Sequence, residues 1–171
     1  MAALRTLLLL MLALPAWAAD PQEEIDRFLS DMLGKPPAAE TLWLTGDLQP
    51  AVRGILEHDY PAARIRYWRG GTRTVWVLDE IGKEMPITVG IAINHGAVER
   101  VKVLVYRESR GWEVKSPAFT AQYSGAKLDE GMRLDRHIDG ISGATLSVRA
   151  LSRLTRLALL FDQQVNQGAR P

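Results

Sequence analysis

Residues 87–93 read Ile-Thr-Val-Gly-Ile-Ala-Ile, so a large apolar side chain recurs at every second position. This period of two is that of a β-strand with one face buried in a core. The turn sequence Asn94-His95-Gly96 follows at once, and Val101, Val103 and Val105 then resume the same period. Two runs of this kind around a short glycine turn predict an antiparallel hairpin.

A second hairpin precedes the first one. Arg64–Arg69 and Arg73–Asp79 flank Gly70-Gly71, which is a typical turn between paired strands. Successive hairpins form an antiparallel sheet, and helical patterns on both sides of these strands indicate that helices cover it. We therefore predict an α+β fold with a twisted antiparallel sheet and packed helices.

The N-terminal part of the chain has helical periodicity. Asp20-Pro21-Gln22-Glu23 combines a capping residue, a first-turn proline and a glutamate at the capping-box spacing, and it precedes apolar residues spaced for one helix face. A second short helix is predicted from Asp47 through Leu56. We expect residues 20–62 to form an N-terminal helical segment that acts as a cap or a dimer element.

The C-terminal part has the clearest helical pattern of the chain. Leu151, Leu154, Ala158, Phe161 and Val165 form one apolar stripe. The predicted outward face of this long amphipathic helix carries Arg149, Arg153, Arg156 and Gln163. Between sheet and helix, residues 108–130 are expected to be mostly irregular, with a short helix through Phe119–Tyr123.

The first nineteen residues resemble a secretory signal. Arg5 precedes the apolar run Leu7–Leu14, and Ala16-Trp17-Ala18 has the small-x-small pattern of a cleavage site. The apolar run is shorter than the roughly 20 residues of a membrane-spanning helix. We therefore predict a signal peptide at residues 1–19 and export of the remaining chain to a bacterial periplasm.

Composition excludes several classes of protein. The 171 residues contain 21 Lys+Arg, 20 Asp+Glu and no Cys. Balanced charge excludes the basic footprint of a nucleic-acid-binding domain. The absence of Cys excludes disulfides, thiolate metal sites and iron–sulfur clusters, so redox activity would require an organic cofactor. His58, His95 and His137 are too far apart to indicate a metal site, and we identify no catalytic residues.

The segment before the last helix, Asp139 to Ser147, reads Asp-Gly-Ile-Ser-Gly-Ala-Thr-Leu-Ser. Glycines and hydroxyl residues at a helix start are consistent with a simple N-terminal cap. They are also consistent with an anion site, because free amides and the helix dipole attract phosphate there. The residues alone leave both interpretations open.

The same segment resembles the flavin-attachment motif of the FMN-binding domain family, D-[GS]-x-[ST]-G-A-T-x-[ST]. The family includes the covalent-flavin subunits of Rnf and sodium-pumping NADH:quinone reductase complexes. The resemblance extends over roughly Val75 to Val165 and implies that FMN is linked to Thr145 by a phosphoester installed by a separate flavin transferase. Every specified motif position matches: Asp139, Gly140, Ser142, Gly143, Ala144, Thr145 and Ser147.

A second family segment, H-x-E-T-P-G-x-G, contacts the flavin ring and corresponds to Tyr106–Glu113. Glu108 and Gly111 match this pattern, and Ser109 replaces its Thr, whereas Tyr106, Arg110 and Glu113 depart from it. The resemblance implies ring contacts by Glu108 and Ser109, and Trp112 is favoured as a wall of the ring because it lies in the same segment. Phe119 and Tyr123 are further candidates for the ring environment or for the core.

Together these features predict an FMN-binding domain at residues 63–167 that acts as an electron-transfer carrier without substrate chemistry of its own. Its implied partners are the flavin transferase and an electron donor and acceptor, including membrane redox proteins. Two alternatives stay open: a module that binds FMN or another phosphate ligand non-covalently, and a cofactor-free accessory subunit of a membrane redox complex.

Overall fold

The computed structural model describes residues 20–167, so the predicted signal peptide at residues 1–19 lies outside the described residues. Five strands form one antiparallel sheet in the sequential order β1-β2-β3-β4-β5. The strands are β1 (Glu40–Trp43), β2 (Arg64–Gly70), β3 (Arg73–Ile81), β4 (Pro86–Asn94) and β5 (Ala97–Tyr106). The predicted α+β class and the predicted hairpins are confirmed.

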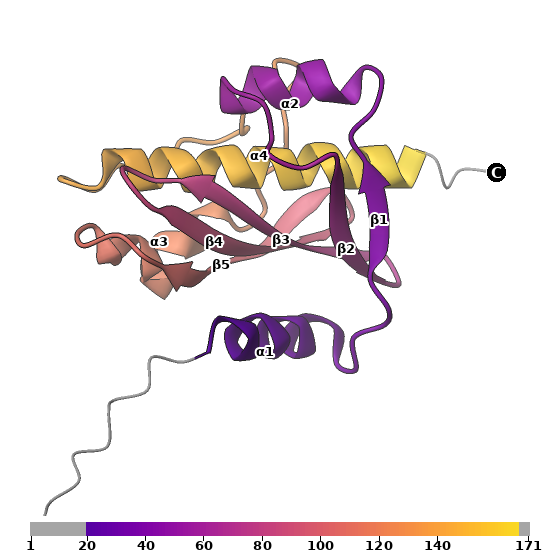
Figure 1. Cartoon of the computed structure of the whole chain (residues 1–171), viewed down its shortest axis with the longest axis horizontal. Helices are drawn as coiled ribbons and strands as arrows, with labels where there is room; N and C mark the ends of the chain where they lie inside the picture. Colours follow the sequence, from indigo (N-terminus) through magenta and orange to yellow (C-terminus); the bar gives the residue numbers. More distant parts are fainter. Residues whose placement is uncertain (1–19, 168–171) are drawn as a thin grey trace, which may run out of the picture.

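Helices cover both faces of the sheet (Figure 1). The long helix α4 (Thr145–Gln167) packs across β3 and β4 on one face, and α2 (Leu48–Leu56) lies against α4 on its outer side. The helix α1 (Pro21–Leu33) packs on the opposite face, against β3, β4 and β5. The short helices η1 (Trp112–Lys115), α3 (Pro117–Thr120) and η2 (Ala121–Tyr123) lie beside β5.

The larger hydrophobic core lies between the sheet and α4, where Trp76, Leu154 and Phe161 are fully buried. A smaller core of Phe28, Leu29, Val75, Ala92 and Leu104 lies under α1. Gly90 explains how α1 approaches the sheet so closely. A Cβ atom at this position would stand 2.5 Å from Cε1 of Phe28, so only glycine leaves room for that ring.

The structure corrects the expected organisation of residues 20–62. The predicted starts of both helices are confirmed, since Asp20 accepts a hydrogen bond from the N–H of Gln22 and α2 begins directly after Asp47. However, α1 and α2 lie on opposite faces of the sheet and do not form one unit, and β1 between them adds a fifth strand. The predicted boundary at residue 63 stays a prediction.

The outward face of α4 is also less open than its sequence suggested. Arg149 and Gln163 are exposed as predicted, whereas Arg153 and Arg156 are partly buried. Arg153 pairs with Glu57 beside α2, and the Nε of Arg156 donates a hydrogen bond to the carbonyl of Met132 at 2.6 Å. These two arginines are covered because α2 and residues 126–135 pack over the helix.

Candidate functional site

The motif at residues 139–147 forms a tight turn and the first residues of α4. The N–H of Ala144 donates to the carbonyl of Ile141 at 3.0 Å, and the N–H of Val148 donates to the carbonyl of Ala144 at 3.0 Å. Ala144 therefore ends the turn, and Thr145 is the first residue of the helix. The side chains of Ser142 and Thr145 are exposed, whereas Ala144 and Ser147 are each only 4% exposed.

The backbone at this turn suits an anion. The N–H groups of Thr145, Leu146 and Ser147 have no partner within the helix, because the first helical N–H groups lack a preceding carbonyl. The positive end of the helix dipole lies at the same place. Gly143 has φ +81°, and an added Cβ there would meet no atom within 4 Å, so the turn requires a left-handed residue in an open position.

The segment after β5 lies directly against this turn. Gly111 has φ +80°, and a Cβ atom there would stand 2.9 Å from both the Cβ of Ala144 and the Oη of Tyr106. Only glycine allows the two segments to approach this closely. The fold thus brings residues 106–112 and 139–147 together, as the family resemblance implied.

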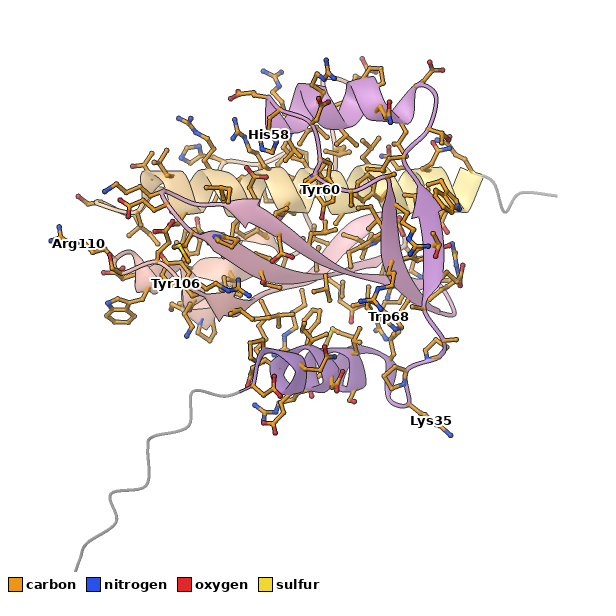
Figure 2. All side chains as sticks on the ribbon, in the orientation of Figure 1. Lys35, His58, Tyr60, Trp68, Tyr106 and Arg110 are labelled. Carbon is orange, nitrogen blue, oxygen red and sulfur yellow. The ribbon has the colours of Figure 1, made fainter. Side chains whose placement is uncertain are left out.

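Tyr106 joins the two segments by hydrogen bonds. Its Oη donates to the carbonyl of Arg110 at 2.5 Å and lies 3.1 Å from the Oγ of Ser147. Figure 2 shows Tyr106 and Arg110 at the same end of the molecule, far from Lys35 and Trp68. This role of Tyr106 was not predicted, because in the sequence the residue is only a departure from the family pattern.

The carboxylate of Glu108 is engaged elsewhere. Its Oε1 accepts hydrogen bonds from the backbone N–H groups of Lys83, Glu84 and Met85 at 2.5, 2.8 and 3.1 Å. The pKa of Glu108 is lowered mainly by the hydrogen bonds that its carboxylate accepts from the N–H groups of Glu84 and Met85. Glu108 therefore holds the β3–β4 turn against the loop, and its predicted contact with a flavin ring stays a prediction.

The remaining predicted site residues, Asp139, Gly140 and Ser109, are all exposed. The N–H of Asp139 donates to Oε1 of Gln122 at 2.8 Å, while its carboxylate is exposed 3.7 Å from Nε2 of His137. These residues keep their predicted assignment to the cofactor, and nothing in their contacts opposes it.

The three candidate aromatic residues differ in their exposure to solvent. Trp112 is 67% exposed and follows Gly111, the residue that lies against Ala144 of the motif. Phe119 and Tyr123 belong to the core, with ring centroids 6.1 Å apart in an edge-to-face pair. Burial raises the pKa of Tyr123 to about 12, and its Oη bonds to the Oγ of Ser152.

The motif lies on open surface. Most motif residues are exposed, and none of five hollows along α1, β5 and α2 and at the C-terminal end of α4 is lined by a motif residue. Within the same residues, no group of three or more acidic or histidine side chains is arranged to hold a metal ion. Likewise, none of the helices between residues 20 and 167 is long and apolar enough to cross a membrane.

Comparisons with known proteins agree with this architecture. Residues 82–160 match the family model of the FMN-binding domain. The crystal structure of NqrC from Shewanella oneidensis has the same fold, with a TM-score of 0.63 and 14% sequence identity, over 86% of this chain and 98% of that chain. Among curated proteins, none matches this sequence significantly.

Proposed function

The chain belongs to the FMN-binding domain family over residues 82–160, and we propose that it carries FMN covalently on Thr145 and passes electrons between redox partners. The observation that carries the proposal is the position of Thr145. Its exposed hydroxyl stands at the first residue of α4, directly after the turn formed by the matched motif. A hydroxyl in this position is open to an enzyme that modifies it.

The open surface favours a covalent link over reversible binding. Sites that retain a small cofactor by contacts alone are concave and enclose most of its surface. Most residues of the motif, Thr145 among them, are exposed, so a bond to Thr145 would supply the retention that an exposed surface lacks. A covalent bond would also keep the cofactor on an exported chain.

The local chemistry favours attachment by a second enzyme. A threonine hydroxyl is a poor nucleophile without a base, and the motif contains no His or Lys to activate it. We propose that a flavin transferase directs the Oγ of Thr145 to the FMN phosphorus of FAD. A new P–O bond forms, the pyrophosphate bond breaks, AMP leaves, and the hydroxyl proton passes to the transferase.

After attachment, the chain's own groups would hold the phosphate and orient the ring. The N–H groups of Thr145, Leu146 and Ser147 are available to the phosphate, whose charge the helix dipole stabilises. Trp112 offers an exposed aromatic face beside the turn. When bound, FMN supplies the redox chemistry, and the protein contributes orientation and electrostatics.

We further propose that the chain is exported to the periplasm by its predicted signal peptide and works with membrane redox proteins. The similarity to NqrC, a subunit of a membrane redox complex, supports partners of this kind.

Co-expression of the full chain with and without a flavin transferase tests the covalent link. We expect flavin fluorescence that stays with the chain after denaturation, together with an intact-mass increase equal to one FMN minus water, only when the transferase is present. Flavin that is released on denaturation would support the non-covalent alternative. A colourless protein under both conditions would support the cofactor-free alternative.

A further inference from the structure

His58 lies in the segment that joins α2 to β2, and its ring contacts another part of the domain. Figure 2 shows His58 at the end of α2 that lies over α4. The Nδ1 atom of the ring is 2.9 Å from the carbonyl oxygen of Asp59, and the Nε2 atom is 3.0 Å from Oε1 of Glu80 in β3. Both ring nitrogens therefore face an oxygen atom, one within the segment and the other on the sheet.

These two contacts favour the protonated ring. A carbonyl oxygen and an ionised carboxylate only accept hydrogen bonds, whereas a neutral imidazole has a single N–H. Either neutral tautomer would leave one ring nitrogen with its lone pair facing an oxygen, and only the imidazolium form donates to both. The hydrogen bond to Glu80 is accordingly the main cause that raises the pKa of His58 above its ordinary value of 6.5, followed by the bond to the carbonyl of Asp59.

The charges around His58 balance only when its ring is protonated. The side chain of Glu80 is 4% exposed and that of Arg153 in α4 is 14% exposed, and the two lie 3.9 Å apart. Arg153 also pairs with Glu57. With a charged His58, the cluster has two cations against the carboxylates of Glu57 and Glu80. Loss of the proton would leave the buried carboxylate with only its longer contact to Arg153, and a buried charge is costly without a close partner.

Three further charged groups near the ring have other partners. Asp59 pairs with Arg53 of α2 at 2.6 Å, and both side chains are exposed. Asp79 precedes Glu80 in β3, so its side chain points to the opposite face of the sheet, where its carboxylate accepts a hydrogen bond from Thr88 at 2.5 Å. The balance of charge in the cluster therefore depends on the imidazole.

The backbone just before His58 has a conformation that it would leave on release. Glu57 has φ +68°, in the left-handed region that residues with a Cβ atom disfavour. Its N–H donates to the carbonyl of Arg53 at 2.8 Å and ends α2. The Glu57 carboxylate is bonded to Arg153, and the ring of His58 holds the residue that follows. Loss of the imidazole contact would let this joint relax, so residues 57–62 would loosen together with the end of α2.

From these contacts we propose that His58 is a proton-dependent latch, which in its protonated form fastens residues 57–62 and α2 onto β3 and α4 and releases them when the proton is lost. The stability that the latch adds is fully present below about pH 6.5 and is lost as the pH rises through the folded-state pKa of His58, because the folded state binds this proton more tightly. Release uncovers the inner face of α2, where Val52, Ile55 and Leu56 are at most 2% exposed.

Hydrogen exchange of the full chain tests the latch. Amide exchange is followed from about pH 5.5 to about pH 8.5, and division by the intrinsic rate at each pH gives the protection of each segment. We expect the protection of Ile55, Leu56 and Glu57 to fall at least about fivefold over this range, while that of β4 changes less than about twofold. Protection of α2 that stays constant, or that falls in parallel with β4, would overturn the proposal.

The titration of the ring itself gives a test that needs no variant. In the wild-type chain, the NMR shift of the Cε1 proton of His58 should have the same midpoint as the loss of protection in α2, and this midpoint should lie above pH 6.5. A midpoint at or below pH 6.5 would mean that the folded state does not prefer the protonated ring, and the latch would be refuted.

Two histidine variants provide a matched control. His58→Gln removes the titrating ring but keeps an amide that can donate to Glu80, so the protection of α2 should change less than about twofold over the same pH range. His95→Asn removes an imidazole from the turn between β4 and β5, where φ is +51° and asparagine is tolerated, and it should keep the wild-type pH dependence. A wild-type pH dependence in His58→Gln, or its loss in both variants, would assign the response to other groups and overturn the proposal.

Discussion

In residues 139–147 the hydroxyls of Ser142 and Thr145 lie on the surface, whereas in residues 106–111 the polar groups of Tyr106 and Glu108 are bonded to other parts of the domain. The two segments touch through Gly111 and Ala144. Residues 139–147 thus present exposed hydroxyls, which the proposed attachment would use, and residues 106–111 hold the scaffold around them. The segment that matches the family motif at every specified position is therefore the exposed one, and the segment that departs from its pattern is the one bonded into the domain.

The largest expected effect concerns Thr145 in residues 139–147. Thr145→Val keeps the shape of the side chain and removes the hydroxyl, so no phosphoester can form and covalent flavin should be lost completely. Because Thr145 is exposed, the free energy of unfolding should change by less than about 0.5 kcal/mol. Intact mass after co-expression with a transferase measures the first effect, and urea denaturation measures the second.

Ser142→Ala is the control for this prediction, because it removes a neighbouring exposed hydroxyl of the same motif. We expect this variant to keep its covalent flavin. An FMN-sized mass increase that persists in Thr145→Val would move the attachment to Ser142 or Ser147.

The second effect compares two glycines with nearly equal dihedral angles. Gly111 and Gly143 have φ +80° and +81°, but only at Gly111 would a Cβ meet close neighbours. Gly111→Ala should cost about 3 kcal/mol, since strain and overpacking add, and Gly143→Ala about 1 kcal/mol from strain alone. Urea denaturation of both variants tests this, and equal costs would show that the contact with Ala144 is not tight.

The third effect concerns the link made by Tyr106. Tyr106→Phe removes the hydroxyl that joins Arg110 and Ser147 and should cost about 1 kcal/mol. In a double-mutant cycle with Ser147→Ala, the coupling energy should reach at least about 0.5 kcal/mol. Faster hydrogen exchange in residues 107–112 should accompany the loss, and additive single effects would argue against the link.

The smallest effect concerns Glu108 and depends on pH. The backbone donors hold its folded-state pKa below the reference value of 4.5, so its carboxylate stabilises the fold above that value. This contribution is lost as the pH falls from 4.5 through the folded pKa. The free energy of unfolding should therefore be larger for wild type than for Glu108→Gln at neutral pH, and this difference should shrink as the pH falls. A difference that stays constant from pH 7 to pH 3 would contradict this role of Glu108.

The strands that were predicted from sequence are those marked by neighbouring residues, either by an alternating apolar pattern or by a turn sequence. β4 and β5 carry a period of two along their length, and Gly70-Gly71 marks a turn, so the hairpins follow from neighbouring residues. β1 escaped prediction because it has four residues, of which three are exposed, and thus no alternating pattern. It is held by non-local contacts, including the hydrogen bond from the Oη of Tyr67 to Glu40 at 2.5 Å.

The same distinction applies to the site. The turn before α4 was predicted because its motif is contiguous, and the proximity of residues 106–112 came from the resemblance. The use of Glu108 by the turn at residues 83–85 was not predicted, since those residues are more than twenty positions away and only the register of β3, β4 and β5 brings them together. Side-chain partners set by strand register have no local signature.

The helical phase of α4 limits how this chain can change in length. Each residue of a helix advances its side chain by 100°, so Thr145 is exposed while Ser147 is buried two positions later. One residue inserted between Thr145 and Leu151 would rotate the Thr145 hydroxyl, the proposed acceptor, toward the core, whereas insertions in residues 127–137 leave this phase intact. Helix geometry therefore fixes the number of residues between Thr145 and the apolar stripe that starts at Leu151. It does not fix the length of the loop at residues 127–137.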